Sequence, residues 1–144
     1  MDTFRGSKLD HAERDRHREI YNLHVDLLRL RRDDPALGNW AAIRYDGAVL
    51  SDDAFCLRVF GAEHGDRLLL FNLGMDLHLN PAPEPLLAPP FRMHWEVAFS
   101  TEHPKYGGYG TAPLDTEENW RIPGRAAVIL NAAAGSPEKR GKRK

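Results

Sequence analysis

Pro35 divides the amino-acid sequence into two parts. The part before it favours a helix, and the part after it favours short strands separated by turns. Neither glycine nor proline occurs between Asp10 and Asp34, and good helix formers dominate that stretch. Pro35 then ends the pattern, because proline lacks the backbone N–H and disfavours a helical conformation in the residue before it. The sequence therefore predicts one long helix over 11–32, with Ser7 or Asp10 able to cap its start.

The apolar face of the predicted helix is unusually wide. At about 100° per residue, one stripe consists of Ile20, Leu23, Leu27 and Leu30. A second stripe continues the arc past it and consists of Tyr21, His24, Val25 and Leu28. A surface helix of a small domain needs an apolar stripe of only about 100°. An arc about twice as wide indicates a helix that packs against two bodies, although Arg16 and Arg31 fall inside it and would each need a polar partner there. We therefore expect one stripe to bury against the rest of the chain and the other to stay exposed. The residues of the expected partner-docking face are Ile20, Tyr21, Leu23, Leu27, Leu28 and Leu30.

After Pro35 the pattern favours short strands separated by turns. Apolar residues alternate or run for four to eight residues, and the dipeptide Asp46-Gly47 is typical of a tight hairpin turn. A proline-rich stretch over 81–90 cannot lie in a central strand. The expected fold is mainly β: an antiparallel Greek-key β-sandwich preceded by one long α-helix. The stretch 41–50 is expected to be one strand or a hairpin that turns at Asp46-Gly47. The other expected strands are 55–60, 67–72, 93–100, 120–122 and 125–130. The expected organisation is a helical segment over 1–36, a sandwich over 37–131 and a disordered basic tail over 132–144.

Composition argues against several classes of function. The formal net charge is −1 with 28% charged residues, so neither nucleic acid nor a membrane is an expected partner. No apolar run reaches the roughly 20 residues of a membrane helix, and the start of the chain is too polar for a signal peptide. The single cysteine, Cys56, favours a reducing, cytoplasmic setting.

Five segments, in one order along the chain, resemble the C-terminal region of malto-oligosyltrehalose trehalohydrolases, a family of amylase-type glycoside hydrolases. Together they span nearly the whole stretch from Asp2 to Leu130, and the last barrel helix and the C-terminal β-domain of that family are the parts they match. The segments are FRGSKLD over 4–10, LRLRRDDPAL over 28–37, RLLLFNLG over 67–74, STEHPKYGGYG over 100–110 and WRIPGRAAVIL over 120–130.

The resemblance implies a parent enzyme that hydrolyses the α-1,4 bond next to the trehalose end of malto-oligosyltrehalose. It also implies that the catalytic carboxylates lie on a (β/α)₈ barrel, outside the matching segments. Two carboxylate pairs do occur here, Asp52-Asp53 and Glu117-Glu118. Sequence neighbours in a strand point to opposite faces, so neither pair converges on one glycosidic bond. We expect no catalytic residue and no cofactor in this chain, which alone should not be an active enzyme.

The glycine-rich loop holds the candidate site for an α-glucan, formed by Tyr106, Gly107, Gly108 and Tyr109. Glycine lets backbone approach another surface closely, and a tyrosine ring can stack on a sugar. The alternative interpretation is that the loop docks on the barrel and that its glycines only supply unusual backbone angles.

Three other groups of residues have structural explanations. Trp95 alternates with Val97 and Phe99 and should lie in the core, as should Trp120, whereas Trp40 is ambiguous. His17 and His24 lie seven residues apart, too far for a helical metal pair, so no metal site is expected. The basic residues over 139–144 are typical of a solvated end.

Three roles remain open for the chain. It can be the domain that covers a catalytic barrel within one enzyme, or a subunit that docks on a separate barrel. It can also be a free carbohydrate-binding module. A chain without its barrel is expected to self-associate through the exposed helix face.

Overall fold

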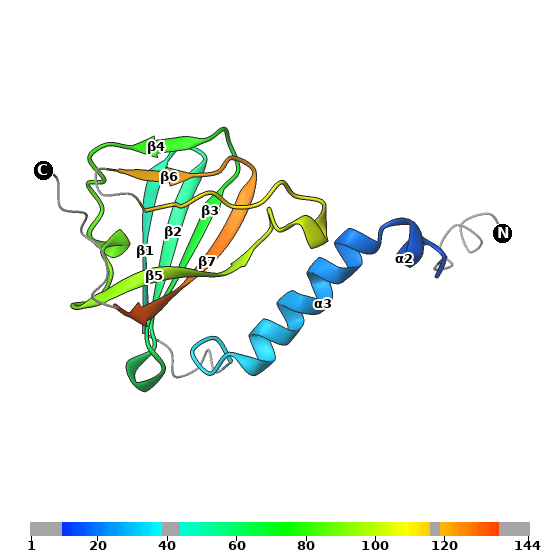
Figure 1. Cartoon of the computed structure of the whole chain (residues 1–144), viewed down its shortest axis with the longest axis horizontal. Helices are drawn as coiled ribbons and strands as arrows, with labels where there is room; N and C mark the ends of the chain where they lie inside the picture. Colours follow the sequence, from blue (N-terminus) through cyan, green and yellow to red (C-terminus); the bar gives the residue numbers. More distant parts are fainter. Residues whose placement is uncertain (1–9, 39–43, 116–118, 136–144) are drawn as a thin grey trace, which may run out of the picture.

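The computed structural model describes residues 10–38, 44–115 and 119–135, and it shows a β-sandwich with one long helix beside it (Figure 1). The helices are α2 (Glu13–Arg16) and α3 (Arg18–Asp33), and three short 3₁₀ turns are η1 (Ala62–His64), η2 (Pro85–Leu87) and η3 (Pro104–Tyr106). The strands are β1 (Arg44–Ser51), β2 (Ala54–Phe60), β3 (Arg67–Asn72), β4 (Leu77–Leu79), β5 (Met93–Ser100), β6 (Trp120–Ile122) and β7 (Ala126–Ala134).

The predicted helix over 11–32 is present, but in two parts. His17, with φ −117° and ψ 44°, leaves the helical region and separates α2 from α3. No proline or glycine causes this break, so composition alone did not indicate it. The C-terminal end agrees with the prediction, since α3 stops at Asp33 and Asp34 is already extended before Pro35.

Two antiparallel sheets make the sandwich. The larger sheet has the order β1-β2-β3-β7-β5, and β4 pairs with β6 in the smaller one. After β3 the chain contributes β4 to the small sheet and then β5 to the edge of the large sheet. It returns to the small sheet as β6 and ends as β7, which lies between β3 and β5 in the large sheet. The prediction of a mainly β, antiparallel sandwich with one long helix is confirmed.

Of the two alternatives for 41–50, the strand is present as β1 and the hairpin that turns at Asp46-Gly47 is wrong. Both residues lie inside β1, where they pair with Arg58 and Leu57 of β2, and the chain reverses at 52–53 instead. Gly47 serves packing: a Cβ there would approach Cδ2 of Leu57 to 2.7 Å. The glycine therefore marks a close cross-strand contact and not a turn.

The predicted alternation of side chains between the two faces of β5 is also interrupted. The pairing between β5 and β7 shifts register between Val97 and Phe99, which is the mark of a β-bulge. Trp95 consequently packs against the core between the sheets, whereas Phe99 packs on the opposite face of the large sheet. The prediction that Trp95, Val97 and Phe99 share one face is therefore wrong for Phe99.

The sandwich extends beyond the boundary predicted at residue 131. Strand β7 continues to Ala134, and Ala132, Ala133 and Ala134 pair with the first half of β5. Alanines carry little apolar periodicity, so this end of the strand did not stand out in the sequence. The rest of the predicted tail, 136–144, lies outside the described residues.

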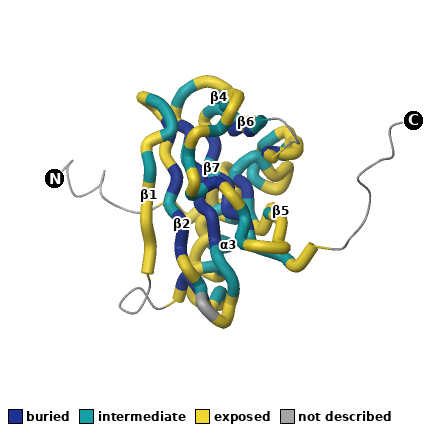
Figure 2. The backbone as a smooth tube through the Cα atoms, turned by 90° about the vertical axis from the view of Figure 1, so that its left-hand side faces the viewer, coloured by how far each residue is buried: buried dark blue, intermediate teal, exposed yellow. Residues whose placement is uncertain are grey.

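Two hydrophobic cores lie on opposite faces of the large sheet, and burial is concentrated in its central strands (Figure 2). The inter-sheet core consists of Cys56, Leu68, Leu70, Leu87, Leu114, Trp120, Ile122, Val128 and Leu130. The helix-side core consists of Leu37, Val59, Leu69 and Ile129, with Leu30 from the last turn of α3 packed against it. The C-terminal end of the helix is thus packed against the sandwich.

Candidate functional site

Helix α3 is held to the sandwich by polar contacts on one of its faces. The carboxylate of Asp26 accepts hydrogen bonds from Nζ of Lys105 at 2.5 Å and from the hydroxyl of Tyr106 at 2.7 Å. These bonds hold the pKa of Asp26 below its ordinary value, with Lys105 as the largest cause. The Tyr106 ring packs at 5.7 Å from the ring of Phe99 on β5. Partial burial, followed by the bond to Asp26, raises the pKa of Tyr106 to about 12.

The glycines of this loop have a conformational role. Gly107 has φ +84°, a left-handed conformation that side chains disfavour, and it ends η3. A Cβ on Gly108 would lie 2.3 Å from the backbone carbon of Glu102. The loop can therefore fold back tightly and present Lys105 and Tyr106 to α3.

The two tyrosines of the predicted sugar site are used differently. Tyr106 is half-buried between the loop and α3, and its hydroxyl is engaged by Asp26. Tyr109 is 99% exposed. The structure thus does not present both rings as one open stacking platform, and Tyr109 is the ring with both faces accessible.

The predicted docking face of α3 is mostly exposed. No residue of α3 is fully buried. Leu23 and Leu30 are half-buried toward the sandwich, whereas Leu28 is 66% exposed and Ile20 is 55% exposed. Tyr21 and Leu27 are also exposed, and Val25 is half-buried. Both stripes contain exposed and half-buried residues, so the prediction that one stripe is buried and the other exposed is wrong. The sandwich covers only part of the wide apolar arc.

The arginines within that arc avoid burial. Arg16 pairs with Asp10, and both side chains are more than half exposed. Arg31 is exposed as well. The expectation that Arg31 needs an internal polar partner was wrong, because the helix face on which it lies is open to solvent.

A cross-strand row of apolar side chains continues the helix-side face of the large sheet. Val49 pairs with Phe55, and Phe55 pairs with Phe71. The two phenyl rings stack with centroids 4.8 Å apart. Val49 is 80% exposed and Phe55 is 37% exposed. The sheet therefore carries exposed apolar surface on the same face that α3 partly covers.

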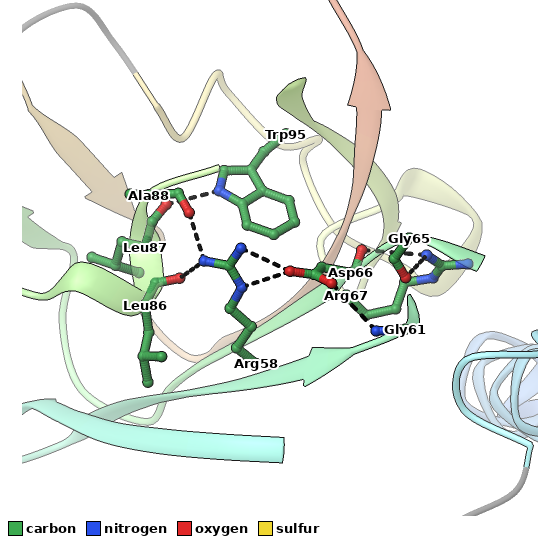
Figure 3. A network of polar contacts seen from close by, with 9 residues as sticks. All are labelled: Arg58, Gly61, Gly65, Asp66, Arg67, Leu86, Leu87, Ala88 and Trp95. Atoms are coloured by element: carbon green, nitrogen blue, oxygen red, sulfur yellow. Dashed lines mark hydrogen bonds and ion pairs between the residues drawn. The ribbon is translucent and has the colours of Figure 1, made fainter. Parts of the chain in front are cut away.

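The buried arginine of β2 is structural. Arg58 donates from Nε and Nη2 to Asp66 and from Nη1 to the carbonyl oxygens of Leu86 and Ala88, at 2.6–3.2 Å (Figure 3). Its guanidinium also lies 5.4 Å from the ring centroid of Trp95. The bonds to Leu86 and Ala88 fasten the proline-rich connection to the sheet, and the bonds to Asp66 hold the loop before β3. These contacts occupy the guanidinium, so it has a structural role.

The remaining candidate residues do not gather at one site. Trp120 is buried, and Trp95 donates from its indole N–H to the carbonyl oxygen of Leu87 at 2.7 Å. Asp52 and Asp53 are exposed at the turn between β1 and β2. Trp40 and the pair Glu117-Glu118 lie outside the described residues.

The residues that the structure describes contain no cluster of three or more histidine, cysteine, aspartate or glutamate side chains suited to a metal ion. None of the described helices has the length and apolarity needed to cross a membrane.

Comparison with known proteins identifies the class of this domain. Residues 44–129 match the family described as Domain of unknown function (DUF3459), which covers more than half of the chain, so the chain belongs to this family. An alignment over 80 residues, which covers 51% of the chain, is 45% identical to the malto-oligosyltrehalose trehalohydrolase of Deinococcus radiodurans. The chain covers 12% of that relative, as expected for a match to one region of a larger enzyme. The resemblance found in the sequence is thereby confirmed. No solved structure matches the chain.

Proposed function

We propose that this chain is a non-catalytic β-domain of a glycoside hydrolase that resembles malto-oligosyltrehalose trehalohydrolase. Its role is to pack on the catalytic barrel and stabilise it. The observation that carries the proposal is the geometry of α3, which binds the sandwich through Asp26 and Leu30 and leaves Tyr21 and Leu28 uncovered. A helix with contacts on one face and exposed apolar side chains on the other is suited to lie between two bodies.

The carboxylates also support a non-catalytic role. Hydrolysis of a glycosidic bond needs two carboxyl groups free to approach the same bond. The most buried described aspartates, Asp34 and Asp66, are each bonded to an arginine. The parent reaction that we propose is release of trehalose from malto-oligosyltrehalose, in trehalose biosynthesis, with the catalytic carboxylates on the barrel. Buried, unpaired Cys56 fits a cytoplasmic setting for such an enzyme.

A chimaeric enzyme tests the proposal. The corresponding C-terminal region of the Deinococcus radiodurans enzyme is replaced by this chain, and trehalose release and the thermal midpoint are measured. We expect an active chimaera whose midpoint falls when Tyr21→Ser and Leu28→Ser are combined. Phe91→Ser is the matched control, since Phe91 is 86% exposed at the start of β5. An equal fall for the control variant contradicts the docking role of α3.

The chain by itself is the second arm of that test. Incubated with malto-oligosyltrehalose, it should release no trehalose above a buffer blank. Release that disappears when one of its own carboxylates is mutated, for example in Asp53→Asn, contradicts the non-catalytic assignment.

A second candidate function is weak binding of an α-glucan. The observation that favours it is the fully exposed ring of Tyr109 beside Gly110, which has φ +93°. One exposed aromatic ring can stack on one sugar unit. A subunit that docks on a separately encoded barrel would use the same α3 face as the covalently joined domain, and the chimaera reports on both.

A further inference from the structure

The charged residues of α3 are sorted between its two sides. At about 100° per residue, Glu19, Asp26 and Asp33 fall within an arc of about 40°. This arc faces the sandwich: Asp26 bonds to the η3 loop, and Cγ of Glu19 lies 3.8 Å from the position of a Cβ on Gly107. The acidic groups of α3 are therefore on or beside its attached face.

The opposite side of α3 is apolar with a basic border. Its exposed residues are Tyr21, His24 and Leu28. The middle of this group lies about 180° around the helix axis from the acidic arc. Arg31 and Arg32 flank this apolar side, and Arg18 lies just beyond Arg32. Arg29 lies nearer the acidic arc, where it pairs with Asp26 at 3.3 Å. Arg18 is 71% exposed, with its nearest carboxylate, Asp15, at 3.9 Å.

We infer that this outward face of α3 binds an apolar surface bordered by aspartate or glutamate. The inference rests on the proposed function, in which a helix of the catalytic barrel provides that surface. Complementary charges around an apolar contact select one partner and reject others.

The same charges disfavour a second copy of this chain as the occupant. When two copies of α3 pack face to face about a two-fold axis, each basic border meets the basic border of the other copy. Neither border of this face of α3 offers an acidic residue in exchange, since Asp33 lies in the acidic arc and pairs with Arg32 at 2.6 Å. Like charges brought together lower affinity. The earlier expectation of self-association through α3 thus has an electrostatic argument against it.

Two synthetic amphipathic helices provide the probe. Both carry the same leucine face, one bordered by glutamate and the other by lysine, and their affinities for the full chain are compared by fluorescence anisotropy. We expect the glutamate-bordered peptide to bind about tenfold more tightly at low salt, and the difference to shrink as salt rises. The double variant Arg18→Glu, Arg31→Glu should reverse the preference. Combined Tyr21→Ser and Leu28→Ser should weaken both peptides, whereas Phe91→Ser should change neither.

Equal affinity for the two peptides, or no binding of either, overturns the inference. A dimer in sedimentation that dissociates in the Tyr21→Ser, Leu28→Ser variant also overturns it and identifies a second copy as the occupant. The chimaeric enzyme separates this failure from failure of the proposed function. If the chain supports an active chimaera and Arg18→Glu, Arg31→Glu leaves its midpoint unchanged, only the charge inference fails. If the peptide preference is present but no active chimaera forms, the domain assignment fails.

Discussion

Nε of Arg67 donates to the carboxylate of Asp34 at 2.8 Å, and each of the two side chains is only 9% exposed. This pair joins the residue that ends α3 to the central strand β3. Nη1 of Arg67 also donates to the carbonyl oxygens of His64 and Gly65 at 3.0 Å. The position of the helix end therefore depends on a buried guanidinium whose Nε and Nη1 are both bonded.

We predict that Asp34→Ala lowers the free energy of unfolding by about 3 kcal/mol, because it leaves a buried guanidinium without its counter-charge. Urea denaturation measures the loss. Arg121→Ala is the matched control: Arg121 also donates to an aspartate at 2.8 Å, but that pair is about half exposed. Arg121→Ala should lower the free energy of unfolding by less than about 1 kcal/mol. Similar losses in the free energy of unfolding for the two variants would show that the buried Asp34–Arg67 pair is no more stabilising than the exposed pair.

The depressed pKa of Asp26 predicts an acid-dependent attachment of α3. A carboxyl group whose pKa is lower in the folded state stabilises the fold above its unfolded pKa, about 3.9, and this contribution is lost as the pH falls through the folded pKa. Wild type should therefore have a higher thermal midpoint than Asp26→Asn at neutral pH, and the difference should narrow below about pH 4. Asp52→Asn, in an exposed turn, serves as the control. A difference that stays constant down to pH 2 contradicts this role of Asp26.

The raised pKa of Tyr106 predicts a separate step in the ultraviolet titration of the tyrosines. Partial burial and the bond to Asp26 raise the pKa of Tyr106 to about 12. Tyr106→Phe should remove the step near that pH and leave the other steps in place. Asp26→Asn should move the same step to lower pH, since it removes the negative charge next to the hydroxyl. A titration unchanged by both variants would mean that the loop does not hold Tyr106 against α3.

The sequence predicted the elements whose signal is local. The 3.6-residue periodicity up to Asp34, and Pro35 after it, located the long helix and its end. The wide apolar arc predicted that part of the helix stays uncovered by the sandwich, and Leu28 is exposed whereas Leu30 packs on the helix-side core. A second neighbour for the helix stays a prediction. These features depend on residues close together in the chain, so the sequence displays them directly.

What the sequence did not show depends on contacts between distant segments. Asp46-Gly47 is a strong turn dipeptide locally, but pairing with β2 keeps it extended. The role of Tyr106 depends on Asp26, which is 80 residues away in the chain. The buried partners of Arg58 and Arg67 were not predicted either, because charged residues within a strand usually indicate a solvated face.

The C-terminal part of β7 predicts a sharp boundary for truncation. Removal of 136–144 leaves the pairing of Ala132 with Trp95 and of Ala134 with Met93 intact, so the thermal midpoint should not change. Removal of 132–144 deletes that part of the ladder beside the edge strand β5 and should lower the midpoint by about 3 °C or more. Calorimetry measures the thermal midpoints of the two truncated proteins and of the full chain. Equal midpoints would show that the last residues of β7 contribute no stability.

The exposed ring of Tyr109 makes α-glucan binding testable at one residue. Tyr106 is engaged by Asp26 and Phe99, so only Tyr109 offers a free face for stacking on a sugar. In a titration with maltoheptaose followed by NMR, amide shifts should centre on the loop around Tyr109 and disappear in Tyr109→Ala. Tyr106→Phe keeps its ring and should bind as wild type does. Shifts confined to residues far from the loop would place any glucan site elsewhere. The absence of shifts at any residue would leave docking on the barrel as the role of the loop, because the contacts of Lys105 and Tyr106 with α3 do not require a sugar.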